Sequence, residues 1–332
     1  MNVQRTDEPT QALIVTRNGG PEVLEVTQRD VGPPGPGELL VRVTAAGVNF
    51  IDVYRREGTY PMPTPFVAGD EGAGRVEAVG SQVSGVAVGD LVAWARCPGS
   101  AAGLVIVEAD KTVPVPAGVP AETAAAAMFQ GLTAHYLVNS SYPVQPGDVV
   151  LVHAAAGGVG QLLTQLVKAK GGAVIATVST EAKAVKARAA GADHVINYSK
   201  VTDIAAAVRE LTGGVGVAAA YDGVGKNTFD ASLDSLRIRG MLVLFGGASG
   251  PVPPVDLQRL NSGGSLNVTR PTLAHFVRTR EELLHRSEEI LGAIAGRTLS
   301  VEIGGRYPLA EAARAYQDLE GRRSTGKLLL IP

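Results

Sequence analysis

The chain has 332 residues, more than one hydrophobic core usually supports, so two domains are expected. Its 30 Lys and Arg residues balance 32 Asp and Glu residues, and no basic tract indicates a nucleic-acid surface. A single cysteine, Cys97, excludes an intramolecular disulfide framework. The first eight residues lack an apolar signal core and no later run reaches membrane-spanning length, so we expect a cytoplasmic protein.

The first third of the chain is typical of a β-rich domain. Short candidate strands occur at 12–15, 38–48, 72–80, 89–94 and 104–107. They are separated by Gly- and Pro-rich turns, of which 31–37 is the strongest breaker. Short strands at this spacing predict a compact β barrel or sandwich.

The composition changes at about residue 121. Alanine-rich 121–128 predicts a helix that resumes at 130–138 after a glycine, which we interpret as a hinge between domains. Five apolar strands are then expected, each of the first four followed by a helix; the strands are 149–153, 172–178, 195–198, 217–222 and 240–247. This alternation predicts a doubly wound parallel sheet, with 266–269 as a candidate edge strand.

The tail returns to a mixed pattern. It predicts a long helix over 279–295, a strand over 300–303, a helix over 309–319 and a last strand over 327–331. We expect the last strand to rejoin the first domain, because a β pattern matches that end of the chain better.

The stretch 149–161 passes from a β-branched strand through small residues into a helix, the setting of a dinucleotide fingerprint. Ala155 takes the first glycine position of G-x-G-x-x-G, ahead of Gly157 and Gly160. Glycines let the backbone approach a pyrophosphate, which the N–H groups of the helix start then bind. The alternative is a tight turn between strand and helix that binds no ligand.

The end of the second strand of the parallel sheet indicates which nicotinamide cofactor binds. An NAD site carries Asp or Glu there, and this chain has Ser179. Lys183 follows in the next helix, and Tyr198 ends the third strand. A hydroxyl and an ammonium suit a 2′-phosphate, so NADPH is expected over NADH. Lys183 alone would be interpreted as a solvated helix lysine.

The positions that hold zinc in alcohol dehydrogenases carry no suitable ligands here. Structural zinc needs closely spaced thiolates, and catalytic zinc usually takes Cys and His. Gly69-Asp70-Glu71 stands in place of a Gly-His-Glu motif, and Asn49 stands in place of a cysteine. The five histidines are scattered along the chain. We therefore predict no metal site.

The chain resembles the zinc-free, zeta-crystallin-like quinone oxidoreductases of the medium-chain dehydrogenase/reductase superfamily. The resemblance covers nearly the whole chain and is carried by 19–24, 47–52, 130–134, 152–160, 191–198, 245–250, 270–273 and 326–328. This family uses an A-x-x-G-x-x-G loop, here Ala154, Gly157 and Gly160, so the missing first glycine does not argue against binding. The stretch 99–104 departs from the family's aromatic-rich pattern, which affects the expected rim of the cleft.

The resemblance implies an α/β protein with a GroES-like β-barrel domain (1–128 and 271–332) and a Rossmann domain (129–270), with NADPH in the cleft between them. Near the nicotinamide and the substrate it implies Asn49, Tyr54, Tyr60, Gln130 and Thr133. The phosphate loop would comprise Ala155, Gly157, Gly158, Val159 and Gly160. Ser179, Lys183, Tyr198 and Arg322 would surround the 2′-phosphate, and Phe245, Gly246, Leu266 and Val268 would line the nicotinamide pocket. Members are commonly homodimers.

The implied reaction is NADPH-dependent reduction of a small quinone, without zinc. Tyr54 and Tyr60 are candidate proton donors, and packing or loop anchoring explains them equally well. Asn49 and Asp52 are expected to fix a loop or a water network. The alternatives are a 2-alkenal or enoyl reductase on the same scaffold, and a weakly catalytic NADPH-binding sensor or RNA-binding protein.

Overall fold

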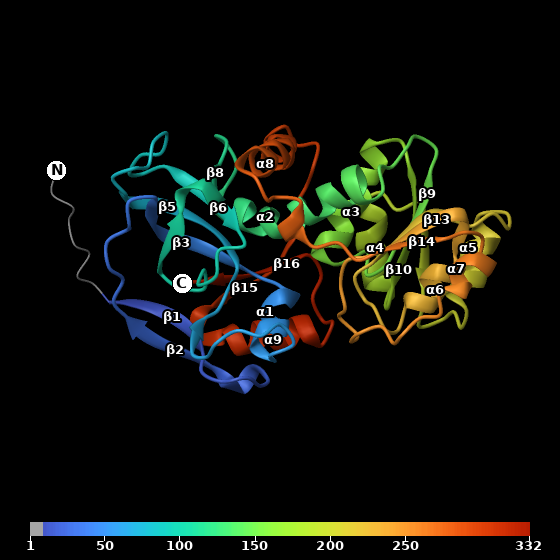
Figure 1. Cartoon of the computed structure of the whole chain (residues 1–332), viewed down its shortest axis with the longest axis horizontal. Helices are drawn as coiled ribbons and strands as arrows, with labels where there is room; N and C mark the ends of the chain where they lie inside the picture. The colour runs from blue at the N-terminus through green and yellow to red at the C-terminus, as the bar shows by residue number, and fades with distance from the viewer. Residues whose placement is uncertain (1–8) are drawn as a thin grey trace. The chain divides into compact units, whose positions relative to one another are not determined.

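The computed structural model describes residues 9–332. Met1–Glu8, on which the expectation of no signal leader rests, lie outside the described residues. The described residues form two compact units: the first comprises 9–129 together with Val277–Pro332, and the second is Gln130–Phe276 (Figure 1). The division into separately folding domains at 128/129 and 270/271 stays a prediction.

The first unit is built on two sheets. The larger has the order β15-β16-β3-β5-β6-β8, with β7 also paired to β3. Its strands are β3 (Glu38–Val48), β5 (Glu71–Val79), β6 (Leu91–Ala95), β7 (Leu104–Glu108), β8 (Thr112–Pro114), β15 (Ile303–Pro308) and β16 (Lys327–Ile331). The smaller sheet, β2-β1-β4, comprises β1 (Thr10–Val15), β2 (Leu24–Arg29) and β4 (Phe66–Val67). The helices α1 (Phe50–Arg56), α8 (Arg280–Ala295) and α9 (Ala312–Glu320) belong to this unit.

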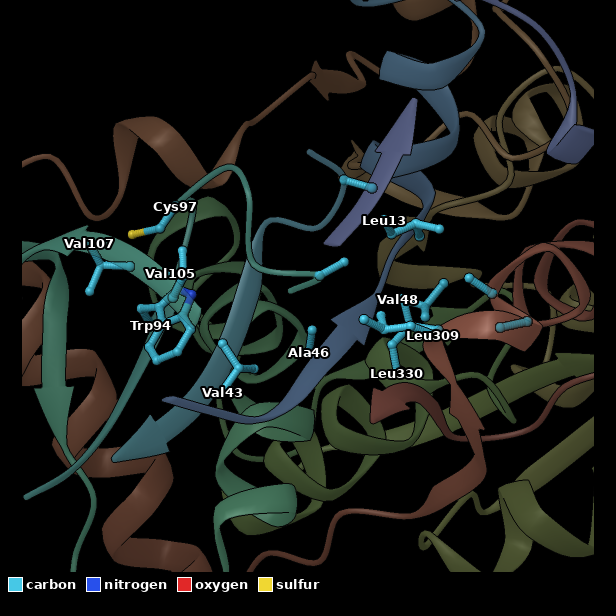
Figure 2. Packing of buried hydrophobic residues seen from close by; sticks show 14 of the residues in the cluster. Leu13, Val43, Ala46, Val48, Trp94, Cys97, Val105, Val107, Leu309 and Leu330 are labelled. Atoms are coloured by element: carbon cyan, nitrogen blue, oxygen red, sulfur yellow. The ribbon is translucent and has the colours of Figure 1, made fainter. Parts of the chain in front are cut away.

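The core of the first unit joins segments from both ends of the chain. Leu13, Val48, Leu309 and Leu330 belong to one buried cluster, and Figure 2 shows Val48, Leu309 and Leu330 pointing toward one another. β16 pairs antiparallel with β3, which confirms that the last strand rejoins the first domain. Trp94 is fully buried in the same cluster, and its indole N–H donates to Ser100 Oγ at 2.8 Å.

The second unit is a parallel sheet of six strands. Their order, β11-β10-β9-β12-β13-β14, corresponds to the Rossmann order 3-2-1-4-5-6. The strands are β9 (Val149–Val152), β10 (Ala173–Val178), β11 (His194–Asn197), β12 (Val217–Asp222), β13 (Leu236–Leu244) and β14 (Asn267–Thr269). Figure 1 shows α3 (Gly158–Ala169) and α4 (Glu181–Ala189) on one face, and α5 (Ile204–Leu211) and α6 (Phe229–Asp234) on the other. The strand order reverses between β9 and β12, where such sheets bind ligands beyond their carboxyl ends.

Three local expectations were wrong. Helix α2 (Ala121–Tyr136) runs unbroken through Gly131, since a buried glycine weakens a helix without ending it. A π-helical turn, η3 (Leu137–Ser141), follows. β15 begins at Ile303 instead of ending there, because the pair Gly304-Gly305 lies at a shift in the register with β16 and does not stop the strand. Helix α1 was missed because it is short, although a capping box of Asn49 and Asp52 marks its start.

Within the described part of the chain, no helix combines the length and the apolar character needed to cross a membrane. The short helices η1 (Pro21–Val23), η2 (Ala109–Lys111), α7 (Gln258–Ser262), η4 (Leu273–His275) and η5 (Leu309–Glu311) complete the elements.

Candidate active site

The predicted phosphate loop lies between β9 and α3, at the carboxyl edge of the parallel sheet. Gly157 is the N-cap of α3, and no side chain caps this helix. The N–H groups of the first turn of α3 therefore have no side-chain acceptor at the cap. A helix start in this state is a ready anion site, so the loop fits a pyrophosphate.

The loop is tight enough to require its last glycine. Ala154 has a positive φ of 51°, a conformation that a non-glycine residue rarely adopts. A Cβ on Gly160 would lie 2.5 Å from Ala154 O and 2.6 Å from Ala155 Cα. Gly160 thus lets α3 pack directly on the turn, the role of the third glycine of the fingerprint. Val159 lies between this glycine and Gly158 in the first turn of α3.

Gln130 lies against this loop. A Cβ on Gly158 would fall 1.7 Å from Gln130 Oε1, so the loop and the glutamine fit only because Gly158 has no side chain. Gln130 Oε1 is buried and has no hydrogen-bond partner among residues 9–332. An acceptor in this state fits a donor on a bound molecule, such as a ribose hydroxyl or a carboxamide. Thr133 is buried one helical turn further along α2.

The three residues predicted for the 2′-phosphate come from adjacent strand ends. β10 and β11 pair up to Val178 and Asn197, so Ser179 and Tyr198 follow neighbouring strands. Ser199 Oγ donates to Ser179 O at 2.8 Å and joins the two ends. Lys183 lies in the first turn of α4, which Thr180 caps. The structure therefore brings Ser179, Lys183 and Tyr198 to one corner of the sheet.

Glu181 does not replace the carboxylate of an NAD site. It starts α4, and its carboxylate pairs with Arg188 at 3.2 Å and lies 3.9 Å from Lys200 Nζ. The acidic residue nearest in sequence to Ser179 is thus held by two surface cations.

The remaining predicted cofactor residues follow β13 or lie at β14. Phe245 N–H donates to Asp222 O at 2.8 Å, and a Cβ on Gly246 would lie 2.4 Å from Gly223 O. Leu266 is buried in the core of this unit, whereas Val268 on β14 is 40% exposed. Arg322 lies in the loop after α9 of the first unit, and its place beside Lys183 stays a prediction.

Tyr54 and Tyr60, the candidate proton donors, form an aromatic pair in the first unit. Their ring centroids are 5.3 Å apart in an edge-to-face arrangement, and Tyr60 N–H donates to Tyr54 O. Tyr54 also lies 6.2 Å from the Phe50 ring, centroid to centroid, on α1. The Tyr60 side chain is 43% exposed. Packing explains much of Tyr54, whereas Tyr60 presents its ring to solvent.

Asn49 is held on both sides of its side-chain amide. Its Oδ1 accepts from Lys327 Nζ at 2.8 Å, and its Nδ2 donates to Glu71 Oε2 at 2.6 Å. Lys327 also pairs with Glu71 at 2.8 Å, and both side chains are fully buried. Burial lowers the pKa of Lys327, and the Glu71 carboxylate opposes that shift. The amide of Asn49 is thus occupied by the protein, which favours a positioning role over substrate contact.

Asp52 lies next to this cluster. Its Oδ2 accepts from Asn49 N–H at 2.9 Å, and its Oδ1 has no hydrogen-bond partner among the described residues. Burial raises the pKa of Asp52 to about 7, and the nearby Asp70 carboxylate adds to the rise. The Asn49 N–H, Lys327 and Arg55 act in the opposite direction without cancelling it.

The raised pKa of Asp52 predicts a pH-dependent stability difference. Because the folded pKa lies above the unfolded value, stability is lost as pH rises through the window from about 4 to about 7. Asp52→Asn removes this loss, so we expect the variant to gain about 3 kcal/mol relative to wild type as the pH rises from about 5 to about 8. Urea unfolding of both proteins at the two pH values measures the gain; a difference that does not change with pH contradicts it.

No group of three or more His, Cys, Asp or Glu within residues 9–332 could hold a metal ion. At two of the positions that carry zinc ligands in alcohol dehydrogenases, Asn49 is bonded as described, and Asp70 pairs with Arg55 at 2.7 Å. The residue types at these positions do not fit zinc. That the protein works without a metal stays a prediction.

Two sets of residues that organise the site were missed in the sequence. One is the buried pair Glu71–Lys327, and the other is a hydrogen-bonded chain through His153 and Asp222. Asp222 could have been noticed, because it is a charged residue that ends an apolar strand. Lys327 gave no such signal, since a lysine at the start of a strand is usually solvated.

Two family models match the chain. The alcohol dehydrogenase GroES-like domain matches residues 35–117, and the zinc-binding dehydrogenase matches residues 158–289. A quinone oxidoreductase of Pseudomonas aeruginosa is 48% identical over 95% of this chain and 97% of its own length. A 2-haloacrylate reductase of a Burkholderia species is 40% identical over 97% of this chain and 98% of its own.

A solved structure supports the same assignment. The crystal structure of Escherichia coli quinone oxidoreductase complexed with NADPH is 42% identical, with a TM-score of 0.94 over 97% of this chain and all of that one. The predicted combination of a GroES-like domain and a Rossmann domain is confirmed. The chain belongs to the quinone oxidoreductase family of the medium-chain dehydrogenase/reductase superfamily.

Proposed function

We propose that this protein is an NADPH-dependent reductase of small quinones. The observation that carries the proposal is the uncapped α3 start behind a glycine loop, together with Ser179, Lys183 and Tyr198 at the neighbouring corner. The Escherichia coli relative, whose structure was solved with NADPH, supports the same cofactor.

The roles in cofactor binding follow from the second unit. The Gly157–Gly160 segment would receive the pyrophosphate, and the cationic Lys183 would attract the 2′-phosphate. The unpartnered oxygen of Gln130 would accept a hydrogen bond from the bound molecule. When bound, NADPH supplies a hydride equivalent, and the protein supplies its position and exclusion of water.

The substrate would meet residues of the first unit. Tyr54 and Tyr60 offer aromatic rings that suit a planar quinone, and Tyr60 is a partly exposed residue with a phenolic hydroxyl. A quinone needs little help from an acid, since its reduced oxygens can take protons from water. Asn49 would fix the start of α1, the helix that contains Tyr54.

Reduction of a conjugated carbonyl is the second candidate, and the 2-haloacrylate reductase of Burkholderia favours it. Turnover of naphthoquinone and of a 2-alkenal, each with NADPH, distinguishes the two candidate functions. We expect the quinone to have the higher kcat/KM, with no loss of activity in the presence of a chelator. A higher kcat/KM for the alkenal would favour a reductase of conjugated carbonyls over a quinone reductase. No turnover of either substrate would contradict both functions, and inhibition by the chelator would contradict the metal-free site.

Lys183→Ala tests the cofactor assignment. A charge-assisted hydrogen bond is worth about 1.5–3 kcal/mol, so the Kd for NADPH should rise roughly 10- to 100-fold. The Kd for NADH, which lacks the 2′-phosphate, should stay within about twofold of wild type. Calorimetric titration of both cofactors measures this; an equal loss for the two would refute the phosphate assignment. Lys186→Ala, on the same helix, is the matched control.

We also propose a cytoplasmic homodimer. β14 is the edge strand of the parallel sheet, and the nearby Ile238 and Val268 are 74% and 40% exposed. An unpaired edge beside apolar side chains suits pairing with a second copy. Sedimentation should give twice the chain mass, and Val268→Lys should shift it to the monomer. A monomeric wild type at micromolar concentration contradicts the dimer.

A further inference from the structure

A continuous chain of hydrogen bonds crosses the interior of the second unit through His153. Thr177 Oγ1 lies 2.9 Å from His153 Nδ1, and Ser232 Oγ lies 2.9 Å from His153 Nε2. Ser232 Oγ in turn donates to Asp222 Oδ2 at 2.8 Å. All four side chains are buried. These residues, Thr177, His153, Ser232 and Asp222, are called the His153 chain below.

The partners fix the direction of every hydrogen bond. A carboxylate only accepts, so the single hydroxyl hydrogen of Ser232 goes to Asp222. Ser232 Oγ must then accept from His153, which places the imidazole hydrogen on Nε2. His153 Nδ1 is left as an acceptor for the hydroxyl of Thr177. Burial lowers the pKa of His153, in keeping with the neutral ring that this pattern requires.

The acceptor end of the chain is anchored in backbone. Asp222 Oδ1 accepts from Val224 N–H at 2.8 Å and from Gly225 N–H at 2.9 Å. Thr228 Oγ1 lies within 2.8 Å of both carboxylate oxygens. The main-chain oxygen of Asp222 accepts from Phe245 N–H at 2.8 Å. The carboxylate is thus a fixed point for the loop that follows β12, and the main chain of the same residue holds the start of the loop that follows β13.

Three of the four members each adjoin a different segment that is assigned to the cofactor. His153 follows β9 and precedes the phosphate loop, whose first residue is Ala154. Thr177 lies two residues before Ser179, at the corner assigned to the 2′-phosphate. Asp222 holds the backbone of Phe245, in the segment assigned to the nicotinamide. Three strand ends that lie far apart in sequence are therefore tied together behind the binding edge.

We propose that His153 is a positioning residue, which holds the phosphate loop, the 2′-phosphate corner and the nicotinamide segment in the relative places that NADPH requires. The inference rests on the proposed function, because it assumes that these segments bind the cofactor. His153 itself does not touch the cofactor in this account; it acts through the backbone of the segments on either side. Fixed supporting hydrogen bonds are what keep such a site in productive geometry.

His153→Phe tests the proposal, because it fills the volume and removes both hydrogen bonds. We expect the Kd for NADPH and the Kd for NADH to rise by the same factor, roughly tenfold. Equal loss for the two cofactors distinguishes this variant from Lys183→Ala, which acts on the phosphate alone. His153→Gln, whose amide offers one donor and one acceptor, should recover most of the affinity.

The matched control is Tyr142→Phe. It removes a hydrogen bond of 2.9 Å to Asp148 in the same unit, at the amino end of β9 and away from the binding edge. Both variants should lower Tm, and only His153→Phe should weaken the cofactors. A lower Tm with unchanged Kd values would reduce His153 to a structural residue. If His153→Phe does not fold, Thr177→Val removes one donor and is judged by the same two readouts.

The hydrogen assignment has its own test. The imidazole nitrogen signals of isotope-labelled wild type should show a hydrogen on Nε2 and none on Nδ1 from about pH 6 to pH 8. A hydrogen on Nδ1 would overturn the assigned direction of the chain and with it the proposal. If wild type binds neither NADPH nor NADH, the proposed function falls and this inference with it; if wild type binds and His153→Phe binds equally well, only the inference falls.

Discussion

Lys327→Met is expected to lower the free energy of unfolding by about 3–5 kcal/mol, the usual effect of removing one partner of a buried ion pair. The methionine fills the space, but the fully buried Glu71 carboxylate loses its cation. Asn49 Oδ1 loses its donor at the same time. Glu71 Oε2 keeps its hydrogen bond from the neutral Asn49 amide, which does not balance a buried charge. Urea unfolding measures the loss.

Two further variants make this result specific. Lys327→Met combined with Glu71→Gln leaves a neutral amide beside Asn49, so we expect the double variant to be more stable than Lys327→Met alone. Lys111→Met removes an exposed pair with Glu108 and should change stability by less than about 1 kcal/mol. A Lys327→Met variant that is no less stable than Lys111→Met would contradict the buried pair.

Gly160→Ala is expected to weaken NADPH binding on the order of 100-fold, the upper end of what overpacking by 1–3 kcal/mol can do. The new Cβ would meet Ala154 O at 2.5 Å and Ala155 Cα at 2.6 Å, and both are backbone atoms that cannot rotate away. The loop must therefore move away from α3, and the N–H groups at the start of this helix no longer point toward the pyrophosphate. Calorimetric titration with NADPH measures the effect.

A control glycine must not have a positive φ, which excludes Gly147 of the second unit. Gly292→Ala in α8 therefore serves as the control for Gly160→Ala. Nothing lies within 4 Å of a Cβ on Gly292, and a helical alanine is favourable there. We expect its Kd for NADPH to equal that of wild type. Unaltered NADPH affinity in Gly160→Ala would mean that the glycine loop does not bind the cofactor.

The parallel sheet and its loop could be predicted because their signals are local. A β-branched run, small residues and an amphipathic helix follow one another within about 20 residues, and each is set by its own backbone and burial. The same holds for Ser179 and Tyr198, which end successive strands and so must lie together at one edge. Alternation of strand and helix then fixes the layers.

The buried charge cluster could not be predicted, because its members are distant in sequence. Lys327 and Asn49 are 278 positions apart, and Lys327 and Glu71 are 256 apart. The pairing of β16 with β3 and of β3 with β5 brings them together, and no local pattern encodes those registers. Asn49 was expected near the nicotinamide and the substrate, where it would fix a loop or a water network, but its partners Lys327 and Glu71 were not predicted.

The His153 chain could not be predicted from the sequence for a related reason. A lone histidine beside a glycine loop is usually a satisfied core residue, and nothing in the sequence indicates its partners. Thr177 and Ser232 can be recognised as the partners of His153 only once the strand order, with β9 between β10 and β12, is known. Polar residues at the ends of buried strands are the one signal that the sequence offers, and Asp222 is the example.

The most direct test of NADPH-dependent quinone reduction is the kcat/KM for naphthoquinone, measured by absorbance with NADPH and then with NADH as hydride donor. The contact of Lys183 with the 2′-phosphate by itself predicts a preference for NADPH of roughly 10- to 100-fold. Equal rates with the two donors, or no reduction with either, would contradict the account.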